Sequence, residues 1–252
     1  MAGSVPRRAA TAAPADYLTH YRLDAEAILD PRDLEPQQRA SEARRIEALV
    51  RMLAPSAGER MMDLGCGSGW LAARCRRTGA EVHAVDLSPR GVAAARRRFP
   101  EVDRFHVADV YRLPFQPASF DALVLSEVLE HLTEPVQALV EVRRVLLPGG
   151  RLLICVPYRE RILQHLCIHC NRLTPANAHL HSFAEADLAA ALEEAGLRVR
   201  RFAFLANKAL ALVGFPRWSR SWPHGCWQLC DRLANRLLRK PAFVAVLAVR
   251  PD

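Results

Sequence analysis

Short apolar runs alternate with amphipathic segments through most of this 252-residue chain. The runs with the length and apolar character of strands are RMMDLG (60–65), EVHAVDL (81–87), RFHVADV (104–110), FDALVLS (120–126), RLLICVP (151–157), RVRRFAF (198–204) and AFVAVLAV (242–249). The segments between them with a helical period are LAARCRRT (71–78), RGVAAARRRF (90–99), PVQALVEVRRVL (135–146) and EADLAAALEEAG (185–196). This alternation predicts an α/β fold whose mainly parallel sheet is covered on both faces.

The segment before the first strand has a different pattern. Residues 1–15 are rich in Ala, Pro and Arg without a period, which predicts a disordered tail. Residues 16–57 are predicted to form N-terminal helices, which Pro31 and Pro36 divide into a short early helix and a longer second one. Residues 58–252 then form one domain, in which Pro148-Gly149-Gly150 predicts a turn before the strand 151–157.

Composition narrows the class of protein. No apolar run approaches the roughly 18 to 20 residues of a membrane span. Seven scattered cysteines and no export signal argue against a disulfide framework, so we expect a cytoplasmic protein. The net charge of +8 leaves nucleic acid open as a partner, but the composition favours an ordinary basic surface, because the charge is nearly all arginine on expected helix faces.

The stretch MMDLGCGSGWLA (61–72) carries the strongest chemical signal. Gly65, Gly67 and Gly69 lie between a strand and a helix, where glycine lets a ligand sit against main-chain N–H groups. The spacing is G-x-G-x-G, whereas the dinucleotide fingerprint is G-x-G-x-x-G. Asp63 precedes the glycines, and a carboxylate there would repel a pyrophosphate and attract a cationic ligand.

Two further acids end successive strands. Asp86 closes the second strand, where a carboxylate can accept hydrogen bonds from ribose hydroxyls, and Asp109 follows the third. Open α/β sheets bind ligands at the carboxyl ends of their parallel strands. Three acids in register at that edge predict a ligand-binding site.

These blocks together resemble a known family. DLGCGSG, VDLS, ADVYRLPF, FDALVLSEVLEHL and LLPGGRLLICVP are similar, in order, to the class I S-adenosylmethionine-dependent methyltransferases, over about residues 58–204. The resemblance implies a Rossmann-like, doubly wound sheet of seven strands, with the antiparallel last strand supplied by AFVAVLAV. It also implies S-adenosylmethionine as cofactor.

The resemblance places the cofactor residue by residue. Asp63 and the turn Gly65, Cys66, Gly67 and Gly69 would hold the methionine end. Asp86 and Leu87 would hold the ribose, and Asp109 with Val110 the adenine edge. Ser126 and Glu127 would border the methyl group.

The segment CIHCNRLTPANAHLHSF (167–183), within an insert spanning 158–183, has the spacing of a metal site. Cys167 and Cys170 are a common zinc half-site, and His179 and His181 can supply the other half, with Thr174-Pro175 as the turn between them. Four protein ligands leave no open position, so this zinc would be structural. The alternative is two buried cysteines and two surface histidines.

The same histidines fit a second metal hypothesis. In SEVLEHL the spacing of Glu127, Glu130 and His131 resembles methyltransferases that bind a magnesium-type ion beside the cofactor, among them small-RNA 2′-O-methyltransferases and ubiquinone-pathway O-methyltransferases. That resemblance implies that His179 or His181 completes an Mg²⁺ or Mn²⁺ site. The alternative is an ordinary helix start. Without a metal, His131 is the first candidate for a catalytic base and His181 the second.

A helical insert is predicted over residues 206–241, where Leu229, Leu233 and Leu237 repeat at four with arginines between them. It reads as a helix packed on the sheet, as a lid over an acceptor, or as a basic amphipathic surface for a membrane interface. The sequence as a whole predicts a methyltransferase of a small-molecule acceptor. The alternatives are an RNA methyltransferase and a non-catalytic protein that keeps the cofactor fold as a scaffold.

Overall fold

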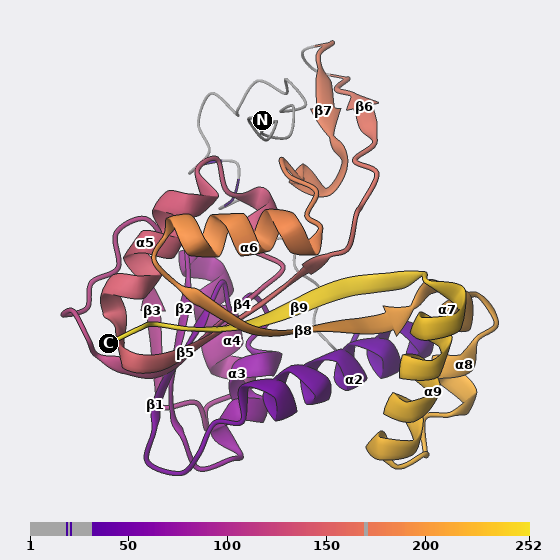
Figure 1. The fold of residues 1–252 in the computed structure, drawn as a ribbon, viewed down its shortest axis with the longest axis horizontal. Coiled ribbons are helices and arrows are strands. Elements are labelled where there is room, and N and C mark those ends of the chain that lie inside the picture. Colours follow the sequence, from indigo (N-terminus) through magenta and orange to yellow (C-terminus); the bar gives the residue numbers. More distant parts are fainter. Residues whose placement is uncertain (1–18, 20, 22–31, 169–170) are drawn as a thin grey trace.

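The computed structural model describes residues 19, 21, 32–168 and 171–252 (Figure 1). The predicted tail (1–15) and nearly all of the early helix lie outside the described residues. The described residues form a seven-stranded sheet in the order β3-β2-β1-β4-β5-β9-β8. Its strands are β1 (Arg60–Leu64), β2 (Glu81–Asp86), β3 (Arg104–Val107), β4 (Phe120–Ser126), β5 (Leu146–Pro157), β8 (Arg198–Asn207) and β9 (Pro241–Val249).

The last strand of the chain is the antiparallel one. β1, β2, β3, β4 and β5 pair in parallel, whereas β9 runs antiparallel to both of its neighbours, β5 and β8. β9 therefore lies inside the sheet although it comes last in the sequence. The predicted fold, a doubly wound, mostly parallel sheet with an antiparallel last strand, is confirmed.

Helices cover both faces of the sheet. α2 (Pro36–Leu53), α3 (Trp70–Arg76) and α4 (Pro89–Arg98) lie on one side, and α5 (Pro135–Val145) and α6 (Glu185–Glu194) on the other (Figure 1). Successive side chains of a strand point to opposite faces. In β1, Met62 and Leu64 accordingly pack in the core under α5 and α6, and Met61 packs under α2 and α3.

The predicted turn at Pro148-Gly149-Gly150 is present but lies within a strand: Gly149 has φ +73°, and a Cβ added at Gly150 would lie 2.7 Å from the Leu147 carbonyl oxygen. These residues belong to β5, which begins at Leu146. The pairing with β4 shifts there, from Phe120 opposite Leu146 to Ala122 opposite Arg151, so the extra residues form an irregularity inside the strand. Proline and glycine interrupted the apolar pattern without ending the strand, as they do at bulges.

Two inserts extend from the sheet. The first holds the short hairpin β6 (Gln164–Leu166) and β7 (Leu173–Pro175), which projects from the body in Figure 1, and the single turn η2 (Ala176–Ala178). The second holds α7 (Lys208–Leu212), α8 (Phe215–Trp218) and α9 (His224–Leu238). Thr174 and Pro175 lie in β7, opposite His165 and Gln164, so the predicted turn at this dipeptide is wrong.

In the part of the chain that the structure describes, no helix combines the length and apolarity needed to cross a bilayer.

Candidate cofactor-binding site

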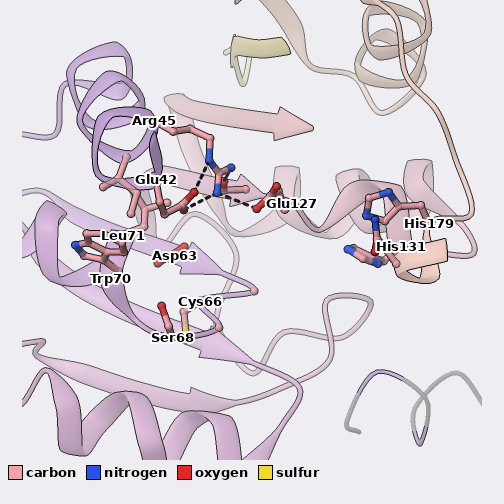
Figure 2. Close-up of a pocket in the computed structure, with 15 residues that line it drawn as sticks. Glu42, Arg45, Asp63, Cys66, Ser68, Trp70, Leu71, Glu127, His131 and His179 are labelled. Atoms are coloured by element: carbon pink, nitrogen blue, oxygen red, sulfur yellow. Dashed lines mark hydrogen bonds and ion pairs between the residues drawn. The ribbon is translucent and has the colours of Figure 1, made fainter. Parts of the chain in front are cut away.

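A pocket of about 480 Å³ opens at the carboxyl ends of β1 and β4 (Figure 2). Its walls come from α2, the glycine turn after β1, the segment after β4 and the first insert. The lining residues are Glu42, Arg45, Ile46, Asp63, Gly65, Cys66, Gly67, Ser68, Trp70, Leu71, Ser126, Glu127, His131, Asn177 and His179.

The glycine turn needs glycine for two separate reasons. Gly65 has φ +78°, and a Cβ added there would lie 2.3 Å from Val128 Cγ2. Gly69 has φ +82°, and a Cβ there would lie 3.1 Å from the Cβ of Ala95. Residues with a side chain rarely adopt this backbone region, so the turn is both strained and crowded for them. The Gly65 and Cys66 amides donate to the Val85 carbonyl at 2.8 and 2.9 Å, which fixes the turn on β2.

Asp63 is a buried acid at the floor of the pocket. It is 1% exposed, and burial raises its pKa to about 7, although a hydrogen bond from the Ala72 amide opposes the shift. Among the described residues, its Oδ2 atom has no hydrogen-bond partner. A buried carboxylate oxygen without a donor is costly, so this site is suited to a ligand that brings a cationic donor.

Asp86 supports the turn from the neighbouring strand. Its carboxylate accepts hydrogen bonds from the Gly67 amide at 2.9 Å and from the Ser88 amide at 3.0 Å. Burial raises its pKa, and these amides, with that of Leu87, lower it. Asp86 and Leu87 are not among the lining residues of the pocket, and Gly69 lies just behind it as the residue before α3.

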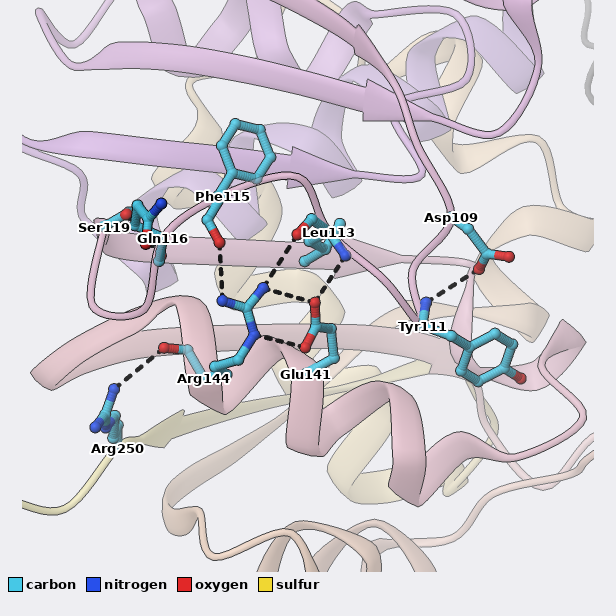
Figure 3. A network of polar contacts seen from close by, with 9 residues as sticks. All are labelled: Asp109, Tyr111, Leu113, Phe115, Gln116, Ser119, Glu141, Arg144 and Arg250. Carbon is cyan, nitrogen blue, oxygen red and sulfur yellow. Dashed lines mark hydrogen bonds and ion pairs between the residues drawn. The ribbon is translucent and has the colours of Figure 1, made fainter.

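Asp109 and Val110 lie further along the same edge. Asp109 accepts a hydrogen bond from the Tyr111 amide at 3.0 Å, and Val110 is buried in the core under α5 (Figure 3). The loop that follows is fastened to α5, because Glu141 accepts from the Leu113 amide at 2.7 Å and Arg144 donates to the Phe115 carbonyl at 2.8 Å. This loop is held beside the pocket but does not line it.

Arg45 is the main site residue that sequence reasoning missed. From α2 it donates to Ser126 Oγ at 2.9 Å and pairs with Glu127 at 2.8 Å and with Glu42 at 2.6 Å (Figure 2). Burial alone would lower the pKa of the guanidinium, but Glu127 and Glu42 raise it. In the sequence Arg45 looks like one polar position between the apolar residues of the helix. The Glu42-x-x-Arg45 spacing could have indicated an ion pair on one face of the helix, but not that Arg45 is buried.

Ser126 and Glu127 both line the pocket, as neighbours at the end of β4. Glu127 has φ +57°, in the left-handed region, and its side chain is held by Arg45. A non-glycine residue in this region is strained, and such residues gather at functional sites.

On the far side of the pocket three ligand-type side chains meet. Atoms of Glu130, His131 and His179 lie within 4.8 Å of one another, and the rings of the two histidines are 4.7 Å apart. Both carboxylate oxygens of Glu130 are buried without a hydrogen-bond partner among the described residues, and burial raises its pKa to about 8. His179 also contacts the carboxylate of Glu160. This set is suited to a proton or to a cation.

The predicted zinc ligands that the structure describes, Cys167, His179 and His181, do not form one cluster. Cys167 lies at the end of the hairpin, where its amide donates to the Arg172 carbonyl, and Cys170 lies outside the described residues. His179 instead belongs to the group with Glu130. His181 lies outside the pocket, with its Nε2 hydrogen-bonded to the Leu132 carbonyl at 2.8 Å.

The pocket fits S-adenosylmethionine by the chemistry of its residues. Asp63 offers a buried carboxylate oxygen, without a partner among the described residues, for the ammonium group of the methionine end, and the strained glycine turn leaves room that a side chain would fill. Asp86 lies at the end of the adjacent strand, where the family resemblance implies the ribose. Ser126, Glu127 and His131, which the family resemblance or the sequence placed near the reacting groups, also line the pocket.

Comparisons with known proteins agree with this site. A family model described as a methyltransferase domain matches residues 62–154. Ubiquinone biosynthesis O-methyltransferase from Xanthomonas axonopodis pv. citri (strain 306) is 36% identical over 166 residues, or 62% of this chain and 69% of that enzyme. Demethylmenaquinone methyltransferase from Clavibacter sepedonicus is 44% identical over 110 residues, or 43% of this chain and 45% of that enzyme. The chain thus spans between 45% and 69% of the length of these two relatives.

Among solved structures, the chain is similar to 1,6-didemethyltoxoflavin-N1-methyltransferase from Burkholderia thailandensis, crystallised with 1,6-didemethyltoxoflavin and S-adenosylhomocysteine. The TM-score is 0.64 at 22% identity, over 98% of this chain and 94% of that one. At this identity the likeness shows the fold alone. The match to more than two thirds of a curated methyltransferase shows the family: the chain belongs to the class I S-adenosylmethionine-dependent methyltransferases.

Proposed function

We propose that this protein transfers a methyl group from S-adenosylmethionine to an oxygen or nitrogen atom of a small molecule. The observation that carries the proposal is the buried carboxylate of Asp63, whose Oδ2 has no partner among the described residues and which lies below the strained glycine turn. When bound, the cofactor supplies a methyl group already activated by its sulfonium sulfur. The protein's task is then mainly positioning and exclusion of water.

The residues of the pocket divide this task. Asp63 binds the ammonium group, and the glycine turn, where a side chain would clash, leaves room for the methionine end. Asp86 orients the ribose. His131, across the pocket, takes the acceptor's proton on a ring nitrogen, a role that suits an imidazole at neutral pH.

One of the two relatives, the O-methyltransferase, favours a hydroxyl as the acceptor group. Their names place them in ubiquinone biosynthesis and on demethylmenaquinone, and the first is an O-methyltransferase. The pocket has a volume of about 480 Å³, which leaves room beside the cofactor for the reacting ring of an acceptor. We therefore expect a phenol or quinol to be methylated, and bulk RNA not to be.

Calorimetry with S-adenosylhomocysteine tests the cofactor step. Wild-type protein should bind it, and Asp63→Asn should weaken binding by about 100-fold, because a charge-assisted bond is lost. Transfer of labelled methyl groups to a panel of catechols and quinols, with bulk tRNA alongside, then tests the acceptor class. Binding without transfer to any acceptor would support the non-catalytic alternative. Transfer to tRNA alone would support the RNA alternative.

A metal-assisted form of the same reaction is the second candidate, favoured by the group Glu130, His131 and His179. Two imidazoles and a buried carboxylate are typical ligands of Mn²⁺, Fe²⁺ or Zn²⁺. An ion held there would lower the pKa of an acceptor hydroxyl. His131 would then be a ligand and not the base.

Metal content separates these candidates from the predicted Cys-His zinc site. We would measure it by mass spectrometry on protein purified without a metal-affinity tag. Metal lost in Glu130→Gln but kept in Cys167→Ser supports the pocket site. The reverse pattern supports the structural zinc, and no metal in wild type with activity unchanged by a chelator leaves His131 as the base.

A further inference from the structure

The second insert, residues 206–241, concentrates the positive charge of the chain. It contains seven Lys or Arg residues and one acid, Asp231, which makes +6 of the chain's net +8. Asp231 is buried, where it accepts hydrogen bonds from the amides of Ala206 at 3.0 Å and Asn207 at 2.7 Å. The one acid of the insert is therefore buried, and the charged groups on its outer surface are all basic.

The longest helix of this insert, α9, exposes an apolar row. Its buried side packs Trp227 and Ala234 inward. On the outer side Leu229, Leu233 and Leu237, spaced at four, are 58%, 50% and 77% exposed. Residues spaced at four lie on one face of a helix, so these leucines form a continuous stripe.

Arginines lie beside this stripe. Arg232 and Arg236, also spaced at four, are exposed on the outer side of α9 next to the leucines. Leu212 and Val213, at the end of the neighbouring α7, extend the exposed apolar surface. An exposed apolar stripe flanked by arginines is the pattern of a helix that lies in a membrane interface.

A basic pocket opens where this insert meets the sheet. It has a volume of about 500 Å³ and shares no lining residue with the cofactor pocket. Its lining residues are Tyr158, Arg159, Phe204, Lys208, Asn235, Arg239, Lys240 and Pro241. Four of these side chains are cationic and none is acidic.

Three of the four cations are available to a ligand. Within the described ranges, no carboxylate lies at ion-pair distance from Lys208, Arg239 or Lys240, whereas Arg159 pairs with Glu185 at 3.7 Å. Arg239 follows α9 directly, so the pocket opens at the C-terminal end of the helix that carries the leucine stripe. Converging lysine and arginine groups recognise a phosphate-type anion.

We propose that the second insert docks this protein on bilayers that contain anionic phospholipids. α9 lies in the interface with its leucine stripe among the acyl chains, and a lipid phosphate enters the basic pocket. The charge is complementary to an anionic leaflet. The leucines favour a membrane over RNA, which would not bury them. The flanking arginines oppose pairing with a second copy of the same face.

Sedimentation of the full chain with vesicles tests this proposal. Wild type should bind vesicles of phosphatidylcholine mixed with phosphatidylglycerol at least about tenfold more tightly than phosphatidylcholine alone, and added salt should weaken the binding. The variant Leu229→Ser/Leu233→Ser/Leu237→Ser should lose at least about tenfold on the mixed vesicles. The variant Arg239→Glu/Lys240→Glu should lose at least about 30-fold and with it the preference for anionic lipid.

Two matched variants serve as controls, and thermal unfolding checks the fold of every variant. Arg96→Glu/Arg97→Glu changes the same charge on exposed positions of α4 and should keep most of the binding. Leu166→Ser/Leu173→Ser removes exposed leucines of the β6–β7 hairpin and should also keep it. Loss confined to the hairpin variant, or equal loss in the α4 variant, overturns the proposal.

Other occupants give distinct results. Inorganic phosphate bound by calorimetry without vesicle binding would show a soluble anion site. Binding of tRNA that depends on the cations and not on the leucines, again without vesicle binding, would show a nucleic-acid surface. A dimer in sedimentation velocity that the leucine variant dissolves would show a second copy of the chain. Each of these results overturns the proposal.

Discussion

Asp63 lowers the stability of the cofactor-free protein but favours the binding of a cationic ligand. Its carboxylate is buried at the glycine turn, with one oxygen unpartnered among the described residues and with Asp86 adding negative charge nearby. Ionising such a group inside the protein costs free energy that the fold must offset elsewhere. A cationic ligand removes this cost, so the cofactor-free protein is less stable than its core would allow.

We predict that Asp63→Asn raises the free energy of unfolding of the cofactor-free protein by about 1 to 3 kcal/mol at pH 8. The amide keeps the shape and removes the buried charge. Chemical denaturation with and without S-adenosylhomocysteine measures both effects: the ligand should stabilise wild type and not the variant. A less stable cofactor-free variant would contradict this account.

The same residue sets a pH dependence. Burial raises the folded pKa of Asp63 to about 7, above the usual value of an unfolded aspartate, so between about pH 4 and pH 7 the folded state binds more protons. Stability of the cofactor-free protein should therefore fall as the pH rises through this window. Wild type should show the fall, and Asp63→Asn should show a smaller one.

Substitution of Gly65 can distinguish the cost of a strained backbone from the cost of a steric clash. Gly65→Ala adds a strained φ and a clash with Val128, whereas Gly149→Ala adds a similar φ of +73° in open space. We expect Gly149→Ala to cost about 1 kcal/mol of unfolding free energy and Gly65→Ala clearly more.

The clash at Gly65 can be removed independently. Val128→Ala deletes the methyl group 2.3 Å from the added Cβ, so the double variant Gly65→Ala/Val128→Ala should recover part of the loss. Urea unfolding of the four proteins forms a double-mutant cycle. An additive cycle would mean that the turn, and not the contact, requires glycine.

We predict that replacing Arg45 lowers both the free energy of unfolding and the activity of the site. Arg45→Ala leaves Glu42 and Glu127 without their shared cation and should cost about 2 kcal/mol, less than a fully buried pair because both acids stay partly exposed. It should also lower kcat/KM, since Ser126 and Glu127 lose the group that positions them. Arg51→Ala, which breaks a surface pair with Glu47 on the same helix, is the control and should change neither by much.

At the scale of elements, α2 connects the cofactor pocket to the second insert. Adjacent residues of this helix face the two regions: Arg45 reaches Glu127, and Arg44 donates to Ser219 after α8 and lies 4.9 Å over the Trp227 ring of α9. The insert is thereby fastened to a helix that also forms a wall of the site.

We predict that Arg44→Ala loosens this attachment without opening the sheet. Hydrogen exchange should accelerate in α8 and the start of α9, while β1 and β4 stay protected. Arg39→Ala, on the exposed side of the same helix, should leave the exchange of α8 unchanged. Uniform acceleration across the sheet would instead assign Arg44 to global stability.

The strands were predictable because central parallel strands are apolar on both faces and read as continuous runs. The order of motifs along the chain then led to the fold through the family resemblance. Positions that depend on tertiary contacts were not predictable. The burial of Arg44 and Arg45 on an apolar helix, the strand through Pro148-Gly149-Gly150, and the meeting of His179 with Glu130 all depend on partners far away in the sequence.

At the scale of the whole molecule, the two inserts contribute to two different pockets. The cofactor pocket is closed in part by the first insert through Asn177 and His179, and the basic pocket belongs to the second. Each insert follows a strand that the sequence predicted, β5 for the first insert and β8 for the second. Where they fold in space could not be read from their composition.

The sheet depends on its last strand. β9 pairs with β5 on one side and with β8 on the other. Deleting residues 241–252 leaves both neighbours with unpaired edges, and we expect the shortened chain to lose cooperative unfolding and affinity for S-adenosylhomocysteine. Far-UV circular dichroism during heating, with limited proteolysis, checks this. A cooperative, ligand-binding truncated chain would show that the sheet closes without β9.

This placement of β9 has a consequence for how the protein is made. While the ribosome is still adding the second insert, β5 has already emerged with an apolar edge that nothing yet covers. The partner for that edge, β9, follows the whole second insert in the sequence, so the sheet stays open until β9 has left the ribosome. Chaperone binding during translation should therefore be concentrated in the interval between the emergence of β5 and that of β9.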